Sequence, residues 1–292
     1  MTLGLPAGTL VAERYRVLDR LGEGAFGDVH RVERVADGAH FAMKVLKQSD
    51  SESRARLRRE ATALSTLAHP NVVSVVELGE DSGRMFLVSE LLSGMSLEAR
   101  LEAELIAPAE ALRLLDALLG GLAFAHAMGV AHRDLKPANV FLVGSPTTPS
   151  VKLLDFGLAK FHEPSAFGHH TVLTAHGAIL GTPDYMAPEQ VFGPTVDVRA
   201  DVYAAGVVAF EMLTGRVPFT GDDLPDLFRA HLLEKPPGLA VACPQRRFAP
   251  ELEAIVARAL EKRPQDRFAD ARAMRTALAR LPKGRSMVES VP

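Results

Sequence analysis

The eight residues His132–Asn139 constrain this chain more than any other part of its sequence. They place a carboxylate, an ammonium group and an amide on one short loop, at Asp134, Lys136 and Asn139. In this arrangement the carboxylate can accept a hydroxyl proton, the ammonium group can hold a migrating phosphate, and the amide can ligate magnesium. Five fixed positions at about 1/20 each, over roughly 290 starting points, give a chance match near 10⁻⁴. A solvated polar loop at the end of a helix therefore explains the pattern poorly.

Composition sets wide limits on the class of protein. The chain has 292 residues, 47% of them hydrophobic, which is enough for a large core in one domain or two lobes. Its formal net charge of −3 gives no electrostatic argument for nucleic-acid binding. One cysteine, Cys243, excludes an internal disulfide and suits a reducing cytoplasm. The longest apolar stretch, Tyr203–Phe210, is shorter than the ~18 residues that span a bilayer. We therefore expect a cytoplasmic chain without a membrane segment, with the open alternative that it is part of a longer, membrane-anchored protein.

The hydrophobic pattern changes along the chain from strand-like to helix-like. Alternating apolar residues and turn signals predict strands over 15–21, 29–33, 40–46, 72–78 and 85–91. A helical stripe predicts a helix over 53–67. Further helices are predicted over 112–128, 200–214, 252–261 and 269–281. The change near residue 92 predicts an N-terminal lobe over 1–91, a C-terminal lobe over 92–281 and a flexible tail over 282–292.

A glycine-rich motif lies in the strand-rich part of the chain. Gly22, Gly24 and Gly27 have no Cβ atoms, so that their backbone N–H groups could lie over phosphates. This spacing alone could equally open a dinucleotide-binding fold. However, the motif precedes a predicted strand instead of a helix, and Lys44 follows Gly27 by seventeen residues. Because Lys44 stands in an apolar run, it needs a partner or an anionic ligand.

Together these motifs have the order and spacing of the protein kinase family, which the chain resembles along nearly its whole length. The segments that carry the resemblance are Gly22–Val29, Phe41–Lys44, Glu60, His132–Asn139, Asp155–Gly157 and Ala187–Glu189. The resemblance implies an α+β, two-lobed protein kinase fold. The N-lobe would hold a small antiparallel β-sheet with one helix, and the larger C-lobe would be mainly helical.

The resemblance also implies chemical roles for single residues. Asp134 would be the base that orients and deprotonates the substrate hydroxyl, and Lys136 would neutralise the transferring phosphoryl group. Lys44 would bind phosphate and pair with Glu60, although Glu60 alone could equally be one charge in a solvated run. The residues that would hold Mg²⁺, or Mn²⁺ in its place, are Asn139 and Asp155.

An ATP site is implied at the glycine-rich loop, the strands after it and the link between the lobes. Its residues would be Leu21, Gly22, Glu23, Gly24, Ala25, Phe26, Gly27, Val29, Ala42, Lys44, Glu90, Leu92, Ser96 and Phe141. Ser89 stands where many relatives carry a bulkier residue at the rear of the pocket. We therefore hypothesise that the site tolerates enlarged ATP analogues.

The segment between Asp155 and Glu189 would be the activation segment. Arg133 implies a buried cation, and in the family its anion is often a phosphorylated residue of this segment. Thr174 is the first candidate for that phosphorylation and Thr171 the second, with ordinary loop hydroxyls as the alternative. Thr182, in a Gly-Thr-Pro run, is instead expected in the substrate platform.

Two contacts inside the C-lobe are also implied. Glu189 would pair with Arg267, and Asp201 would cap the backbone of the catalytic loop. Tyr203 stands where family members often have Trp, a departure that bears on packing.

Three functions fit these residues: an active serine/threonine protein kinase, a pseudokinase scaffold that binds nucleotide, and a small-molecule phosphotransferase. The complete set of catalytic residues argues against the scaffold, and the segment 181–189 supplies a platform for peptide substrates that small-molecule kinases lack. We therefore predict a non-specific serine/threonine protein kinase that uses ATP and protein substrates and autophosphorylates on its activation segment. Arg14–Val17 and Tyr185–Gln190 resemble bacterial eukaryotic-like kinases, in which phosphorylation in trans within a homodimer is common.

Overall fold

The computed structural model describes residues 4–24, 27–46, 68–145, 147–156, 183–192, 196–282 and 288–290. The chain forms two compact units. The first unit includes Met1–Ser93, and the second includes Gly94–Phe156 and the described residues that follow. The division lies close to the change of hydrophobic pattern near residue 92. The predicted helix over 53–67 lies outside the described residues.

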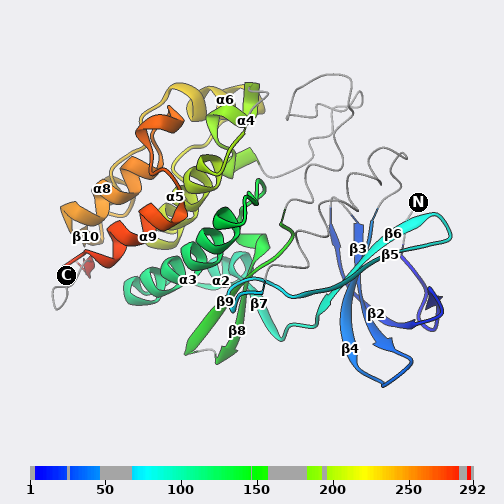
Figure 1. Cartoon of the computed structure of the whole chain (residues 1–292). Helices are drawn as coiled ribbons and strands as arrows, with labels where there is room; N and C mark the ends of the chain where they lie inside the picture. The colour runs from blue at the N-terminus through cyan, green and yellow to red at the C-terminus, as the bar shows by residue number, and fades with distance from the viewer. Residues whose placement is uncertain are drawn as a thin grey trace. The chain divides into compact units, whose positions relative to one another are not determined.

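The first unit is built on a six-stranded sheet with the order β1-β2-β3-β4-β6-β5, in which neighbouring strands are antiparallel (Figure 1). Its strands are β1 (Leu10–Val11), β2 (Tyr15–Gly24), β3 (Gly27–Arg34), β4 (His40–Leu46), β5 (Val75–Asp81) and β6 (Arg84–Glu90). Strand β5 begins three residues later than predicted. The reason is a turn in which the Val72 N–H donates to the His69 carbonyl at 3.0 Å, so that the ladder starts only at Val75.

Alternation along the strands gives this sheet two distinct faces. One face carries the hydrophobic core, which includes Val32, Met43 and Val88. The other face carries the odd-numbered residues of β3 and the even-numbered residues of β4, because Val29 lies opposite Lys44 in the register. The strand register therefore separates the core from the face that holds the candidate phosphate-binding lysine.

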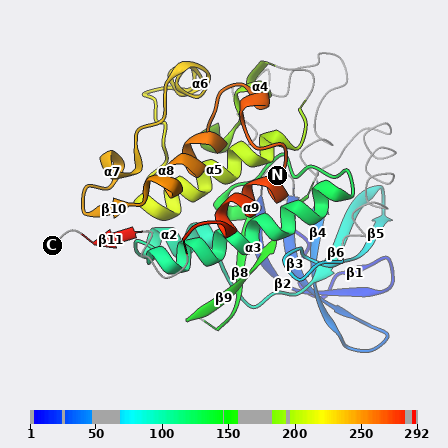
Figure 2. The ribbon, with the colours of Figure 1, turned by 60° about the vertical axis from the view of Figure 1, so that its left-hand side comes forward.

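The second unit is mainly helical. Its helices are α2 (Leu97–Ala103), α3 (Pro108–Ala127), α4 (Pro188–Phe192), α5 (Arg199–Thr214), α6 (Leu224–Leu233), α7 (Leu239–Ala242), α8 (Pro250–Ala259) and α9 (Ala271–Ala279). Helix α5 is the centre of the unit: every residue from Ala200 to Phe210 is buried, and α3, α8 and α9 pack around it (Figure 2). At Gly206 of α5, a Cβ atom would lie 2.8 Å from the Cβ of Ala259 on α8. Glycine therefore lets these two helices approach closely.

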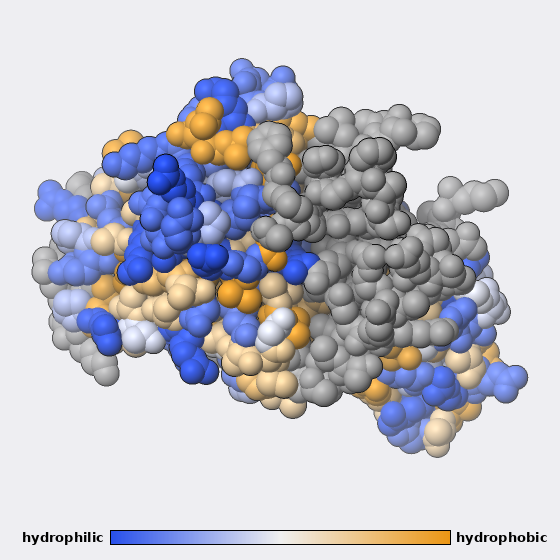
Figure 3. All heavy atoms as spheres, turned by 45° about the horizontal axis from the view of Figure 1, so that its top comes forward, coloured by the Kyte–Doolittle hydropathy of each residue, from blue (hydrophilic) through white to orange (hydrophobic). Residues whose placement is uncertain are grey.

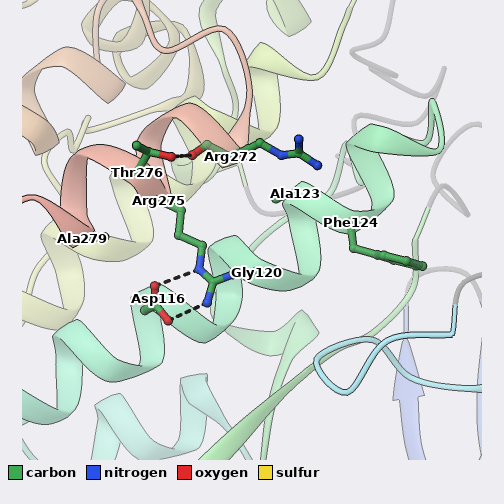
Figure 4. Close-up of a pocket in the computed structure, with 8 residues that line it drawn as sticks. All are labelled: Asp116, Gly120, Ala123, Phe124, Arg272, Arg275, Thr276 and Ala279. Atoms are coloured by element: carbon green, nitrogen blue, oxygen red, sulfur yellow. Dashed lines mark hydrogen bonds and ion pairs between the residues drawn. The ribbon is translucent and has the colours of Figure 1, made fainter.

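Helix α9 lies along α3, and one exposed ion pair joins them. The Arg275 guanidinium donates to both carboxylate oxygens of Asp116 at 2.8 and 2.9 Å, at a pocket whose lining also includes Gly120 and Ala123 (Figure 4). Helix α3 ends where Gly129 adopts a positive φ of 74° and donates its N–H to the His126 carbonyl. The helix thus ends close to the predicted limit at residue 128.

The second unit also contains two small sheets that the hydrophobic pattern did not predict. Strands β7 (Gly94–Ser96), β8 (Val140–Ser145) and β9 (Thr148–Leu153) form an antiparallel sheet in that order. Strand β10 (Arg246–Phe248) pairs with β11 (Val288–Ser290). Part of the predicted flexible tail over 282–292 is thus a strand, held by a ladder to residues some forty positions away. Strands this short show too little alternation to be read from one sequence.

None of the described helices is long and apolar enough to cross a membrane. On the face drawn in Figure 3, hydrophilic and hydrophobic residues are interspersed over the described surface.

Candidate active site

The three groups of the catalytic-loop motif lie together in the second unit. The Lys136 ammonium lies 3.0 Å from the Asp134 carboxylate. The Asn139 side-chain amide donates to the Asp134 carbonyl at 2.7 Å and to its carboxylate at 3.0 Å. Asp134 is part-buried, so that its carboxylate stays accessible while two donors hold its orientation. The loop therefore presents an oriented carboxylate beside a cation.

A buried carboxylate holds the backbone of this loop. Asp201, at the start of α5, is 1% exposed and accepts the N–H groups of His132 and Arg133, both at 2.7 Å. Arg133 has a positive φ of 66°, an uncommon conformation for a residue with a side chain. Two charge-assisted hydrogen bonds stabilise that conformation. The expected cap on the catalytic loop is thus present in the geometry.

His126 of α3 completes the surroundings of Asp201, and the sequence reasoning did not identify it. Its Nε2 lies 2.9 Å from the Asp201 carboxylate, and the Ala271 N–H points to its Nδ1 at 3.3 Å. Because Nδ1 accepts, Nε2 carries the proton and donates to Asp201. Burial by itself would raise the pKa of Asp201, but the hydrogen bonds from His126 and from the Arg133 backbone N–H hold that pKa below its usual value. In the sequence, the signal that could have indicated this role is a single histidine inside an apolar helix.

The two candidate metal ligands are brought together by a hairpin. In the β8–β9 pair Val140 lies opposite Leu153, so that Asn139 and Asp155 leave the hairpin at the same end. The Leu154 N–H donates to the Asn139 carbonyl at 2.9 Å and closes this end. Since the Asn139 amide nitrogen donates to Asp134, its Oδ1 has no partner among the described residues and can act as an oxygen ligand.

The residues around the loop form a buried platform. The His132 and Phe156 rings lie 4.6 Å apart between centroids, and both residues are buried. Gln190 of α4, which the sequence reasoning missed, donates to the Arg133 carbonyl at 3.0 Å and accepts the Ala187 N–H at 3.0 Å. Gln190 therefore ties the Ala-Pro-Glu segment to the catalytic loop.

The expected Glu189–Arg267 pair is present and buried. The Arg267 side chain is 0% exposed and donates to both carboxylate oxygens of Glu189 at 2.7 and 2.8 Å. Its guanidinium also lies 4.8 Å from the centre of the Tyr203 ring. The pairing satisfies a buried charge, since an unpaired guanidinium in this place would be costly.

Tyr203, in place of the common Trp, reaches a second buried histidine. The Tyr203 hydroxyl lies 2.9 Å from Nδ1 of His231 on α6, which is 0% exposed. Burial, and then the nearby charge of Lys262, lower the pKa of His231 to about 4. Lys262 itself donates to the Ala230 and His231 carbonyls at 3.2 and 2.7 Å, and its pKa is lowered to about 8, chiefly by burial.

In the first unit, the strand register places four of the predicted ATP-binding residues, Gly22, Val29, Ala42 and Lys44, on one face, whereas Glu23, opposite Asp28, lies on the other face. Gly22 lies opposite Val29, Val29 opposite Lys44, and Ala42 opposite Ser89. Lys44 is 8% exposed. Gly27 has a φ of 156°, and a Cβ atom there would lie 2.1 Å from the Val45 carbonyl oxygen. At Gly27, the backbone of β3 thus approaches β4 more closely than a residue with a side chain would permit.

The remaining predicted residues divide between the units. Leu21 and Glu23 lie on β2, and Glu90 ends β6, where its carboxylate accepts the Ser74 N–H at 2.8 Å. In the second unit Ser96 lies opposite Phe141, and its hydroxyl caps α2 by accepting the Ala99 N–H at 3.1 Å. Leu92 lies between β6 and β7. The predicted site residues outside the described part of the chain are Ala25, Phe26, Glu60, Thr171, Thr174 and Thr182.

Comparison with known proteins identifies the family. The protein kinase domain family matches residues 15–278. Serine/threonine-protein kinase pkn3 of Myxococcus xanthus is 38% identical over 291 residues, which cover 98% of this chain and 53% of that protein. Serine/threonine-protein kinase Pkn1 of the same organism is 41% identical over 90% of this chain and 38% of its own length. The chain thus spans about half or less of these relatives. It belongs to the protein kinase family.

The structural comparison agrees with this assignment. The kinase domain of PknI from Mycobacterium tuberculosis matches with a TM-score of 0.73 and 29% sequence identity, over 94% of this chain and 99% of that domain. The predicted kinase fold is confirmed. The antiparallel sheet of the first unit and the mainly helical second unit are the parts of that fold described above.

Proposed function

We propose that this chain is a serine/threonine protein kinase that transfers the γ-phosphoryl group of ATP to hydroxyl groups of proteins. The observation that carries the proposal is the loop in which Lys136 and Asn139 orient the Asp134 carboxylate while Asp201 holds the loop backbone. In phosphoryl transfer the protein mainly positions groups and stabilises charge, which is what such a loop can do.

The positions of the groups support a separate role for each. Asp134 accepts the proton of the substrate hydroxyl while the hydroxyl oxygen attacks the γ-phosphorus of ATP. The bond between the γ-phosphorus and the bridging oxygen breaks, and ADP leaves with its electrons. Lys136 neutralises charge on the transferring group. Lys44 and the glycine N–H groups of the first unit bind the phosphates. Their shared strand face supports this role.

Asn139 and Asp155 would hold Mg²⁺, which neutralises charge on the phosphates when it is bound. Among the described residues, no group of three or more His, Cys, Asp and Glu side chains could hold a metal. Two oxygen ligands at one hairpin end fit magnesium well, because it usually keeps waters and substrate phosphates as its other ligands.

Autophosphorylation on the activation segment is part of the proposal. The Arg133 guanidinium donates to the Val196 carbonyl at 3.3 Å, but its Nε is buried and has no partner among the described residues. A phosphate on Thr174, or on Thr171, would supply an anion for this cation. Phosphorylation in trans would make the initial rate rise with the square of the kinase concentration.

The first test is intact-mass and peptide mass spectrometry after incubation with ATP and Mg²⁺. Wild type is expected to gain phosphate on Thr174 or Thr171, whereas Asp134→Asn is expected to lose autophosphorylation by about 10²- to 10⁴-fold. Asp116→Asn serves as the matched control, because it makes the same change at an exposed carboxylate on α3. No phosphate on any of these proteins, with nucleotide still raising the melting temperature, would favour the nucleotide-binding scaffold.

Ser89 offers a separate test of the ATP site. Its position opposite Ala42 on the Lys44 face supports the hypothesis of a roomy pocket. Wild type is expected to use an ATP analogue enlarged at the N6 position at least about tenfold better than Ser89→Met does, relative to ATP. Equal discrimination by both proteins in a competition assay would contradict the hypothesis.

A further inference from the structure

One arginine bridges two carboxylates on the hairpin that carries the glycine-rich loop. The Arg20 guanidinium lies 2.7 Å from the Glu23 carboxylate and 2.6 Å from that of Asp28. Glu23 and Asp28 are directly opposite each other in the β2–β3 register. Like charges at opposite positions of an antiparallel pair repel each other and destabilise the pairing. Arg20 therefore neutralises a repulsion built into this hairpin.

The bridge lies beside the phosphate-binding glycines but on the other face of the sheet. Gly24 and Gly27 are the next register pair after Glu23 and Asp28. Val29 shares a face with Lys44, so that its neighbour Asp28 points to the opposite face. The Asp28 side chain is 6% exposed, whereas that of Glu23 is 64% exposed. Among the described residues, Arg20 is thus the side-chain partner of Asp28 in a place that water hardly reaches.

The sequence could not indicate this bridge. Residues three apart on a regular strand point to opposite faces, which would separate Arg20 from Glu23. Here the register shifts between Arg20 and Gly22, so that Leu21 is an extra residue and Arg20 returns to the face of Glu23. The β-bulge is therefore what allows one guanidinium to reach both carboxylates.

We propose that Arg20 is a positioning residue for the phosphates of ATP. By neutralising Glu23 and Asp28 it keeps the hairpin paired up to Gly24 and Gly27, whose N–H groups would bind the phosphates. Without Arg20, the two carboxylates separate the strands and leave uncompensated negative charge near the phosphates. The inference rests on the proposed function, because it takes the glycine-rich hairpin as the phosphate site.

The experiment measures the affinity of the full chain for two ligands by calorimetry. One is the non-hydrolysable ATP analogue AMP-PNP with Mg²⁺, and the other is adenosine, which has no phosphate. Arg20→Gln is expected to weaken AMP-PNP binding about tenfold and adenosine binding by less than about twofold. Arg34→Gln is the matched control, because Arg34 of β3 lies on the same face as Asp28 and pairs with the single carboxylate of Asp37. It is expected to change both affinities by less than about twofold.

Two rescue variants distinguish charge neutralisation from a general loss of structure. Arg20→Lys keeps the charge, and the double variant Arg20→Gln/Asp28→Asn removes the repulsion, so that both are expected to restore AMP-PNP binding to within about threefold of wild type. If Arg20→Gln does not fold, the inference is still tested by these two variants, which are expected to fold and to bind AMP-PNP with near-normal affinity.

Several results would overturn the inference. They are an unchanged AMP-PNP affinity in Arg20→Gln, an equal loss for adenosine, an equal loss in Arg34→Gln, or no recovery in the double variant. Failure of wild type to bind AMP-PNP at all would instead overturn the proposed function, and the inference with it. The two kinds of failure are distinct, because only the second concerns the wild-type chain.

Discussion

The two compact units hold their functional groups by different means. In the first unit, Gly22, Val29, Lys44 and Ala42 share a face because backbone ladders set the register of their strands. In the second unit, the described residues form no ladder across Asp134, and side chains hold the catalytic loop instead: Asp201 from α5, which His126 from α3 contacts, and Gln190 from α4.

This difference predicts which changes each unit tolerates. Where the backbone positions the groups, the critical property of a residue is its size, since an added atom can separate two strands. Where buried side chains position the groups, the critical property is charge and hydrogen bonding, because removing one partner leaves others buried and unsatisfied. Substitutions that change only one of these properties can test the comparison.

The largest effect is expected for Asp201→Ala. This change leaves the buried N–H groups of His132 and Arg133 without an acceptor, and we expect a loss of about 3–5 kcal/mol in the free energy of unfolding. Urea denaturation followed by circular dichroism measures it. Asp116→Ala removes a carboxylate that is 46% exposed on the same unit, and should cost less than about 1 kcal/mol. Similar losses in both variants would contradict the role of Asp201.

A second effect concerns pH and the buried His231. Its pKa of about 4 in the folded chain lies below the ordinary 6.5, so that the unfolded chain binds the proton first as the pH falls. Stability attributable to His231 is therefore present above pH 6.5 and is lost between pH 6.5 and 4, on the order of 2–3 kcal/mol. The difference in unfolding free energy between wild type and His231→Asn, measured across this range, should show the loss. A difference that does not change with pH would refute it.

A smaller effect is expected in the first unit for Gly27→Ala. The added Cβ would lie 2.1 Å from the Val45 carbonyl oxygen, and the left-handed φ is unfavourable for alanine, so that we expect a loss of about 1–3 kcal/mol. Hydrogen exchange of the β3 and β4 amides reports it locally. Gly22→Ala has no atom within 4 Å of its new Cβ and should leave exchange in these strands almost unchanged. Equal exchange in both variants would show that size does not decide this hairpin.

The smallest effect should come from an exposed pair of the first unit. Arg14 pairs with Glu77 at 2.6 Å, but its side chain is 56% exposed. Arg14→Gln is expected to cost about 0.2–1 kcal/mol in thermal or urea unfolding. A loss as large as that of Asp201→Ala would mean that surface charge, and not only the register, holds the sheet.

Local patterns in the sequence determined much of the chemistry. Asp134, Lys136 and Asn139 are five residues apart at most, and the hairpin strands on both sides of the glycine motif alternate clearly. Such features can be predicted from the sequence, because neighbours along a strand or loop are also neighbours in space. The Glu189–Arg267 pair and the role of Asp201 came from the resemblance to a family, not from periodicity.

Only the tertiary structure decided what holds these groups in place. His126 meets Asp201 across 75 positions, and Gln190 meets Arg133 across 57. No local period encodes such pairs, because packing of whole helices brings them together. The bridge from Arg20 to Glu23 and Asp28 is close in sequence, yet it depends on a bulge at Leu21 that changes which face Arg20 occupies. The sequence by itself thus determined which reactive groups are present. Helix packing and strand register determined which residues hold those groups in place, because packing and register arise only when distant segments of the chain share one core.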